Sequence, residues 1–372
     1  MSVERRRIAA IVTEYRPHSH ADVIVTKFLE GYSIDGQYHA PRVDVVSLYT
    51  DQVPDADMSR AMAAKHGVPI YPTIAEALTC GGDTLAVDGV LLIGEHGDYP
   101  SNEKGQVCYP RRRFFAEAAA VMRASGRAVP AFNDKHLSYS WEDAHWMVAT
   151  ARELAMPLMA GSSLPVTVRR PPLELPLGCP ISEALVAGYG PTESYGFHAL
   201  ETLQCLVERR GESGVAAVRA LQGTAVWEAL DAGEWSPALL AAALARCEHP
   251  QAGNPRDNCA APVAFQLRYR DGLRGTVLLL NGHLTEFGFA ASLLGQTEPA
   301  STLIYLWEGQ PYEHFAYLVR HIEEMFVTGR PQYPVERTLL VTGVLDACMD
   351  SLYRGQVWVE TPHLEVAYLP SR

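Results

Sequence analysis

Three short polar stretches hold most of the side chains that could do chemistry, and each follows an apolar run. "TEYRPHSH" follows "RIAAIV", "GEHGD" follows "VDGVLLI", and "NDKH" follows "RAVPAF". Imidazoles and carboxylates that converge from several loops are what a divalent cation such as Zn²⁺, Mn²⁺ or Fe²⁺ requires. The expected metal ligands are His18, His20, Glu95, His96, Asp134 and His136, with Glu14 and Asp98 in the same cleft.

Such an ion would polarise a substrate carbonyl or lower the pKa of a bound water, and Lys135 or a histidine that does not bind the ion would then move protons. The sequence contains no compact ligand motif such as H-E-x-x-H, so this expectation depends on the fold. Other interpretations stay open. His18 and His20 lie beside a predicted helix start, where either ring could bond a backbone carbonyl, and Asp134 to His136 could form a salt-bridged loop.

The elements around the polar stretches predict that the stretches meet. The patterns favour strands over residues 7–12 and in "RVDVVSLYTDQ", "LAVDGVLLIG" and "RAVPAFNDKH". Helices are expected over residues 21–30 and in "DMSRAMAAKHG", "RRRFFAEAAAVMRASG" and "SYSWEDAHWMVATAREL". This alternation predicts βαβ units and a doubly wound parallel sheet. Ligands of such sheets bind outside the carboxyl ends of the strands, which is where the polar stretches stand.

The second half of the chain has a different composition and a different pattern of elements. "LPVTVRRPPLELPLGCP" is proline-rich and extended, which is typical of a hinge between domains. Asp271-Gly272 is a hairpin dipeptide between two alternating runs, so antiparallel strands are expected there, and "EHFAYLVRHIEEMFVTG" is expected to be a late helix. We predict an α/β chain with a Rossmann-like domain over residues 1–160 and a second domain over 161–372.

The bulk composition bounds the function classes. The chain has 372 residues, which favours two domains, and a formal net charge of -12, which argues against a nucleic-acid partner. The two short basic clusters, Arg5 to Arg7 and Arg111 to Arg113, are expected to be solvated. The seven cysteines include no C-x-x-C pair, and no uninterrupted apolar run reaches about 18 residues. A cytoplasmic protein with a small-molecule substrate, and with neither a membrane nor a nucleic acid as partner, is expected.

Five segments, in this order along the chain, resemble the Gfo/Idh/MocA family of the glucose-fructose oxidoreductase and inositol dehydrogenase type. They are "GVPIYPTIAEAL", "VDGVLLIG", "SGRAVPAFNDKHLSYSWEDAHWMVATAREL", "ESYGFHALETLQ" and "LLVTGVLDACMDSLYRG". Lys135 falls where the family's E-K-P motif has its lysine, and His198 takes the position of the usual catalytic histidine. The resemblance implies a Rossmann-like domain followed by an α+β domain with an open, mainly antiparallel sheet, through which the chain would form a homo-oligomer.

Three departures from the family pattern bear on the cofactor. The glycine fingerprint is replaced by "TEYRPHSH", the E-K-P motif by "NDKH", and the aspartate before the catalytic histidine by Glu193 at a slightly different spacing. Glycines let the backbone approach a pyrophosphate, so their absence removes the usual means of binding NAD(P).

Three hypotheses follow. The first is an enzyme that acts on a small polyhydroxy or carboxylated carbonyl compound by metal-assisted proton transfer, in a lyase, isomerase or hydrolase step, with Lys135, His198 and Glu193 as the catalytic residues. The second is an NAD(P)-dependent oxidoreductase of a sugar or polyol with a variant cofactor turn. The third is a non-catalytic sugar-binding or scaffold protein.

Overall fold

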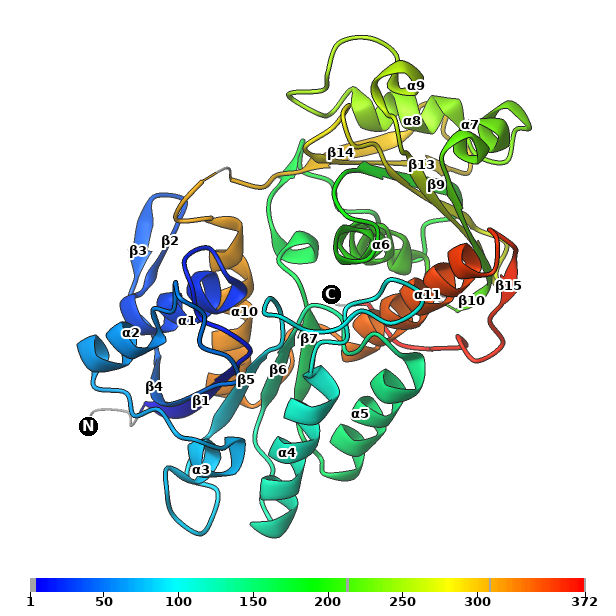
Figure 1. The fold of residues 1–372 in the computed structure, drawn as a ribbon. Helices are drawn as coiled ribbons and strands as arrows, with labels where there is room; N and C mark the ends of the chain where they lie inside the picture. Colours follow the sequence, from blue (N-terminus) through cyan, green and yellow to red (C-terminus); the bar gives the residue numbers. More distant parts are fainter. Residues whose placement is uncertain (1–4, 212–213, 308, 371–372) are drawn as a thin grey trace. The chain divides into compact units, whose positions relative to one another are not determined.

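The computed structural model describes residues 5–211, 214–307 and 309–370, and the chain divides into two compact units (Figure 1). Unit 1 comprises Met1–Pro100, Val107–Ser163 and Trp307–Val335. Unit 2 comprises Ser101–Gln106, Leu164–Leu306 and Glu336–Arg372. Within the described ranges, no helix combines the length and the apolar character needed to cross a membrane.

Unit 1 is built on a five-stranded sheet in the order β4-β1-β5-β6-β7. All four pairings are parallel, as the alternation of strands and helices predicts. Along the chain this order reads second, first, third, fourth, fifth, so the winding reverses between β1 and β5, where open α/β sheets bind ligands. The strands are β1 (Arg6–Val12), β4 (Val43–Thr50), β5 (Gly89–Ile93), β6 (Ala131–Asp134) and β7 (Leu158–Gly161).

Three helices of unit 1 begin directly after a capping serine or threonine. Ser19, Thr73 and Ser140 each accept a hydrogen bond from a backbone N–H in the first turn of the helix that follows, and this satisfies a donor that the helix itself cannot. The helices are α1 (His20–Glu30), α2 (Ser59–His66), α3 (Ile74–Thr79), α4 (Arg111–Ala124), α5 (Trp141–Glu153) and α10 (His314–Thr328).

Two features of unit 1 differ from the prediction. A short hairpin, β2 (Tyr32–Ile34) with β3 (Gln37–His39), follows α1. Helix α10 packs on α1, so residues 307–335 belong to unit 1 although the sequence pattern placed them with 161–372. The physical reason is the apolar face of α10, from which Phe326 is 2% exposed and lies against the open side of Gly89. Helical periodicity shows that such a face exists but does not show which surface covers it.

Unit 2 contains an eight-stranded mixed sheet in the order β15-β10-β11-β12-β9-β13-β14-β8. It is mainly antiparallel, with β12 and β9 parallel, and β11 and β12 form the hairpin predicted at Asp271-Gly272. Its strands are β8 (Arg169–Arg170), β9 (Ile181–Gly188), β10 (Val215–Gln222), β11 (Val263–Tyr269), β12 (Arg274–Leu279), β13 (Phe287–Leu293), β14 (Ala300–Ile304) and β15 (Val359–Glu360). Its helices are α6 (Ser194–Val207), α7 (Thr224–Asp231), α8 (Pro237–Leu244), α9 (Pro255–Asn258) and α11 (Val335–Tyr353).

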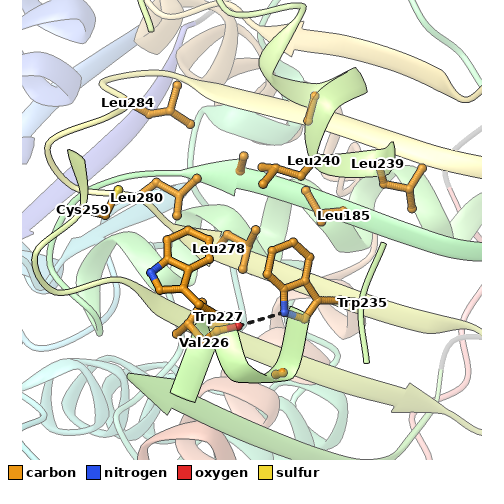
Figure 2. Close-up of a cluster of buried hydrophobic side chains, with 14 of the residues drawn as sticks. Leu185, Val226, Trp227, Trp235, Leu239, Leu240, Cys259, Leu278, Leu280 and Leu284 are labelled. Atoms are coloured by element: carbon orange, nitrogen blue, oxygen red, sulfur yellow. Dashed lines mark hydrogen bonds between the residues drawn. The ribbon is translucent and has the colours of Figure 1, made fainter. Parts of the chain in front are cut away.

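One face of this sheet buries two tryptophans. Trp227 and Trp235 lie in a cluster of leucines from β9, β12 and α8 (Figure 2). Trp235 is 1% exposed, and its indole N–H donates to the carbonyl of Val226 at 3.3 Å. The indole therefore buries a large apolar area without leaving its one donor unsatisfied, which makes it a central contributor to the stability of unit 2.

Replacing Trp235 with alanine is expected to lower the free energy of unfolding of unit 2 by about 3–5 kcal/mol, because it opens a cavity among side chains that cannot fully collapse. Urea denaturation measures the change. The control is Leu294→Ala, at a leucine that is 65% exposed, which should change stability by less than about 0.5 kcal/mol. Equal losses in the two variants would contradict the central role of the Trp235 packing.

Candidate functional site

The polar stretches after β1, β5 and β6 meet at one edge of the unit 1 sheet. Parallel strands that are neighbours in the order β1-β5-β6 end on the same side, so the loops that follow them are adjacent. Thr13 joins the first two loops, since its backbone N–H donates to the carbonyl of Ile93 at 3.1 Å and its hydroxyl donates to the carbonyl of Glu95 at 2.6 Å.

Glu95 lies between two cations. The Lys135 ammonium donates to Glu95 Oε1 at 2.8 Å, and the Arg111 guanidinium donates to Glu95 Oε2. The three residues are 4%, 3% and 1% exposed, respectively. Burial raises the pKa of the Glu95 carboxyl, but Lys135 and Arg111 together bring it well below its ordinary value, so Glu95 is an anion at neutral pH.

Arg111 was predicted to be solvated and is instead a central member of the site. It is the first residue of α4, and it also donates to the imidazole of His136, with Nη1 2.9 Å from Nε2. A ring nitrogen that accepts from a guanidinium cannot carry a proton itself, so His136 is oriented by Arg111. In the sequence Arg111 opens a run of three arginines, and nothing in that run distinguishes the buried one from its neighbours.

His20 and Asp134 form a second buried pair. His20 Nδ1 lies 2.6 Å from Asp134 Oδ2, and the two residues are 9% and 0% exposed. The His20 ring meets the rings of His96 and Phe315 edge to face, both with centroids 5.3 Å apart. Phe315 belongs to α10, so a segment that the sequence assigned to the second domain contributes to this cluster.

His96 is held as a neutral imidazole. Its Nδ1 lies 3.5 Å from a guanidinium nitrogen of Arg16, and its Nε2 is a buried atom with no hydrogen-bond partner in the described part of the chain. Burial, followed by the neighbouring His20, Lys135 and Arg16, lowers the pKa of His96 from 6.5 to about 4, although Glu95 opposes this shift.

The remaining predicted residues have partners outside the buried cluster. Glu14 is 5% exposed and pairs with Arg16 at 2.5 Å, whereas His18 is exposed, with its Nδ1 3.1 Å from the Tyr312 hydroxyl. Asp98 is exposed, and its backbone exchanges two hydrogen bonds with the side-chain amide of Gln52, each 2.9 Å long. Asp98 thus lies in the same loop as Glu95 but faces the loop after β4, and it is not part of the buried cluster.

Three residues of the site have a left-handed backbone. His18, His96 and Lys135 have φ angles of 66°, 69° and 60°. Each such conformation of a residue other than glycine costs on the order of 1 kcal/mol, and such residues persist where the surrounding contacts hold them. Their presence in all three polar loops indicates that the loops are held to aim particular side chains.

The predicted divalent-metal site does not form. Among the residues that the structure describes, no group of three or more His, Cys, Asp or Glu side chains is placed to hold a metal ion. Lys135 and Arg111 occupy the Glu95 oxygens, and their positive charges would repel a divalent cation. The six proposed ligands are divided among separate contacts: Glu95 with its two cations, His136 with Arg111, His20 with Asp134, His96 with Arg16, and His18 with Tyr312.

Glu193 and His198 lie in unit 2, at the start of α6. Glu193 precedes the helix and His198 is 8% exposed, with its ring meeting that of Tyr195 edge to face at 5.5 Å. Their participation in catalysis stays a prediction.

The first turn does not fit the pyrophosphate of a dinucleotide. The N–H groups of Arg16, His18 and Ser19 already have acceptors: the Ser19 hydroxyl at 3.2 Å, the Asp22 carboxylate at 2.9 Å and the Arg16 carbonyl at 3.0 Å, respectively. A dinucleotide needs such groups unoccupied and needs positive potential at the helix start. Here the helix start carries a carboxylate, and the completely buried Tyr15 fills part of the turn.

The acidic residue that could receive a ribose is also occupied. Asp51 directly follows β4, near the place where dinucleotide-binding domains hold the ribose hydroxyls. Its carboxylate accepts from the hydroxyls of Tyr49 and Tyr99 at 2.6 and 2.7 Å and from the Arg113 guanidinium. The protein's own side chains therefore occupy both places at which a Rossmann domain usually contacts its dinucleotide, the turn after β1 and the acidic residue after β4.

The neutral His96 predicts a pH dependence of stability. A histidine whose folded pKa lies below the unfolded value binds its proton first in the unfolded chain, so stability is lost as pH falls from 6.5 towards about 4. Between about pH 7 and pH 5, His96→Gln should lose less stability than the wild type, by on the order of 1 kcal/mol. Urea titrations at the two pH values measure the difference. His66→Gln, at the protein surface, is the control, and an unchanged acid limb in His96→Gln would contradict the prediction.

The comparisons with known proteins bear on the fold. No family model and no curated protein matches this sequence, but solved structures do. GenD2 from gentamicin A biosynthesis, in complex with NAD, is 16% identical, with a TM-score of 0.60 over 97% of each chain. An oxidoreductase from Agrobacterium radiobacter, in complex with NAD+, L-tartaric acid and magnesium, is 13% identical, with a TM-score of 0.58 over 96% of this chain and 98% of that one.

A third similar structure is a myo-inositol 2-dehydrogenase from Lactobacillus plantarum, 12% identical, with a TM-score of 0.56 over 96% of this chain and 99% of that one. At these identities the likeness concerns the fold, and it extends over both units. The fold expected from the five segments is confirmed: the chain has the two-part architecture of the Gfo/Idh/MocA oxidoreductases.

Proposed function

We propose that this protein is an enzyme that moves a proton on a small polyhydroxy or carboxylated carbonyl compound, with Lys135 as the acid/base group. The observation that carries the proposal is the buried contact of 2.8 Å between Lys135 and Glu95 at the edge of the sheet where α/β folds bind ligands. Lys135 also falls where the Gfo/Idh/MocA motif has its lysine.

The surroundings of Lys135 suit this role. Arg111 shares Glu95 with Lys135, so one carboxylate faces two cations and the group of three carries a net positive charge. An oxygen that becomes negative on a substrate, as in an alkoxide or an enolate, would be stabilised near this group. The Lys135 ammonium can supply a proton to such an oxygen, and Glu95 and Arg111 hold the lysine in place.

The reaction class is the second part of the proposal. The comparisons support an oxidoreductase of a sugar or polyol, because the similar structures are oxidoreductases, and GenD2 and the Agrobacterium radiobacter protein contain NAD. The closed first turn and the occupied Asp51 support instead a lyase, isomerase or hydrolase step without a dinucleotide. Both classes require a proton to move at a substrate oxygen, which is the step assigned to Lys135.

Dinucleotide binding separates the two classes. If the protein's own side chains close the turn, the purified wild-type protein should not bind NAD+, NADH, NADP+ or NADPH, and none should be released when the protein is denatured. Nicotinamide fluorescence and calorimetric titration measure this. Stoichiometric binding of any of the four would establish the oxidoreductase class and would show that the cofactor is held outside the first turn.

Substitution of Lys135 tests the acid/base role. Once a substrate is found among polyols, aldoses and 2-oxo acids, Lys135→Met should lower kcat by a factor of about 10² to 10⁴. The matched control is Lys65→Met, which removes another lysine paired with a glutamate, but one whose side chain is 61% exposed. Steady-state kinetics with both variants, each shown to be folded by circular dichroism, decides the matter. A Lys135→Met enzyme with wild-type kcat would refute the role, and a protein that binds sugars without turnover would favour the non-catalytic hypothesis.

A further inference from the structure

The pair of His20 and Asp134 has the geometry of a proton-transferring dyad. The residues are 114 positions apart in sequence, and the fold brings them to a distance of 2.6 Å. Helix α1 starts at His20 and β6 ends at Asp134, so both side chains project from fixed ends of regular elements. Rigid elements hold catalytic side chains more accurately than mobile loops do.

The contact assigns the two nitrogens of the His20 ring. The Asp134 carboxylate is completely buried and accepts from Nδ1, so Nδ1 carries a proton and Nε2 is left as the nitrogen that can gain or lose one. A carboxylate in this position also stabilises the imidazolium that forms when Nε2 takes a proton, which is the arrangement found in Asp-His pairs of hydrolases. The His20 side chain keeps 11% of its surface exposed, so the ring is not sealed in the core.

Two polar atoms beside the dyad point to a ligand. Asp134 Oδ1 and His96 Nε2 are buried and have no hydrogen-bond partner in the described part of the chain. A buried polar atom without a partner costs about 1–3 kcal/mol, so such atoms are rare in folded proteins. The centroid of the His96 ring lies 5.3 Å from that of the His20 ring, which Asp134 contacts, so His96 stands beside the dyad. A polar substrate that bonds His96 Nε2 would remove the cost at that atom.

We propose that His20 is a catalytic base and Asp134 its positioning residue, and that the substrate is an α-hydroxy carbonyl compound, one oxygen of which bonds His96 Nε2. This inference rests on the proposed proton-transfer function. The C–H bond next to the carbonyl breaks, its proton goes to His20 Nε2, and its electron pair forms the enolate. The Lys135 ammonium gives a proton to the enolate oxygen. His20 then returns its proton to the former carbonyl carbon, and the hydroxyl on the carbon that was first deprotonated gives its proton to Lys135. The product is the isomeric carbonyl compound, and no co-reactant is consumed.

Solvent exchange tests the assignment, because the exchanged hydrogen is detected on the substrate itself and no product has to be identified. The wild-type protein in D2O is expected to exchange the carbon-bound hydrogen next to the carbonyl of dihydroxyacetone, glyceraldehyde or fructose, as followed by proton NMR. His20→Gln should lower the exchange rate by about hundredfold or more, and Asp134→Asn should lower kcat with little change in KM. The matched control is His66→Gln, which removes another histidine paired with a carboxylate, His66 Nε2 to Glu30 Oε1 at 3.2 Å, at the surface.

A spectroscopic measurement tests the dyad independently of activity. In the ¹⁵N-histidine spectrum of the wild-type protein, His20 should appear as the Nδ1-protonated tautomer, with a hydrogen-bonded Nδ1 proton far downfield. This signal should vanish in His20→Gln and move in Asp134→Asn. His66→Gln should leave it unchanged. An Nε2-protonated His20 in the wild-type spectrum would overturn the inference whether or not the variants fold.

The outcomes separate this inference from the function on which it rests. Exchange by the wild type that survives in His20→Gln at the same rate would refute the role of His20 and leave the function of Lys135 standing. If the wild-type protein exchanges none of the three probes, the α-hydroxy carbonyl assignment fails. The kinetics of Lys135→Met then decide the proposed function separately, with 2-oxo acids and polyols as substrates.

Discussion

A carboxylate buried between two cations organises the candidate site. Removing ions of the size of Glu95, Lys135 and Arg111 from water costs several kcal/mol for each ion, and the cost is offset only while their contacts are intact. The three residues come from the end of β5, the end of β6 and the start of α4, so the contact fixes the mutual position of three elements. The left-handed backbone of Lys135 is held by the same contact, since the ammonium reaches Glu95 from that conformation.

The histidines His96 and His20 lie beside this group of charged residues. Lys135 and Arg16 add to the burial that keeps His96 neutral, and His96 in turn meets His20 across the reversal of winding between β1 and β5. Helix α10 and the residues just before it also contact the group, with Phe315 of α10 against the His20 ring and Tyr312 against His18. The site thus combines charged residues of the sheet edge with aromatic side chains of a segment that returns to unit 1 late in the chain.

The fold of this protein does not by itself determine what binds at the edge of the unit 1 sheet. The architecture is that of oxidoreductases known with NAD, yet the turn after β1 satisfies its own N–H groups with Ser19 and Asp22, and Asp51 is bonded by two tyrosines and an arginine. A sheet edge accepts many chemistries, because the strands fix where side chains stand and the loops decide what those side chains are. In this protein the same edge presents a cluster of buried charged side chains in place of an open phosphate-binding turn.

The sequence by itself determined the parallel sheet of unit 1 and the hairpin at Asp271-Gly272, because the alternation of strands and helices and the turn dipeptide are local signals. It also predicted that the three polar loops lie together, and the resemblance in five segments identified the fold. Only the tertiary structure decided how those polar groups combine. The sequence leaves open whether Glu95 binds a metal ion or a basic side chain. In the structure its partners are Arg111 and Lys135. The contact of His20 with Asp134 and the return of α10 depend on surfaces far apart in the chain, and no local pattern encodes which of two distant surfaces will meet.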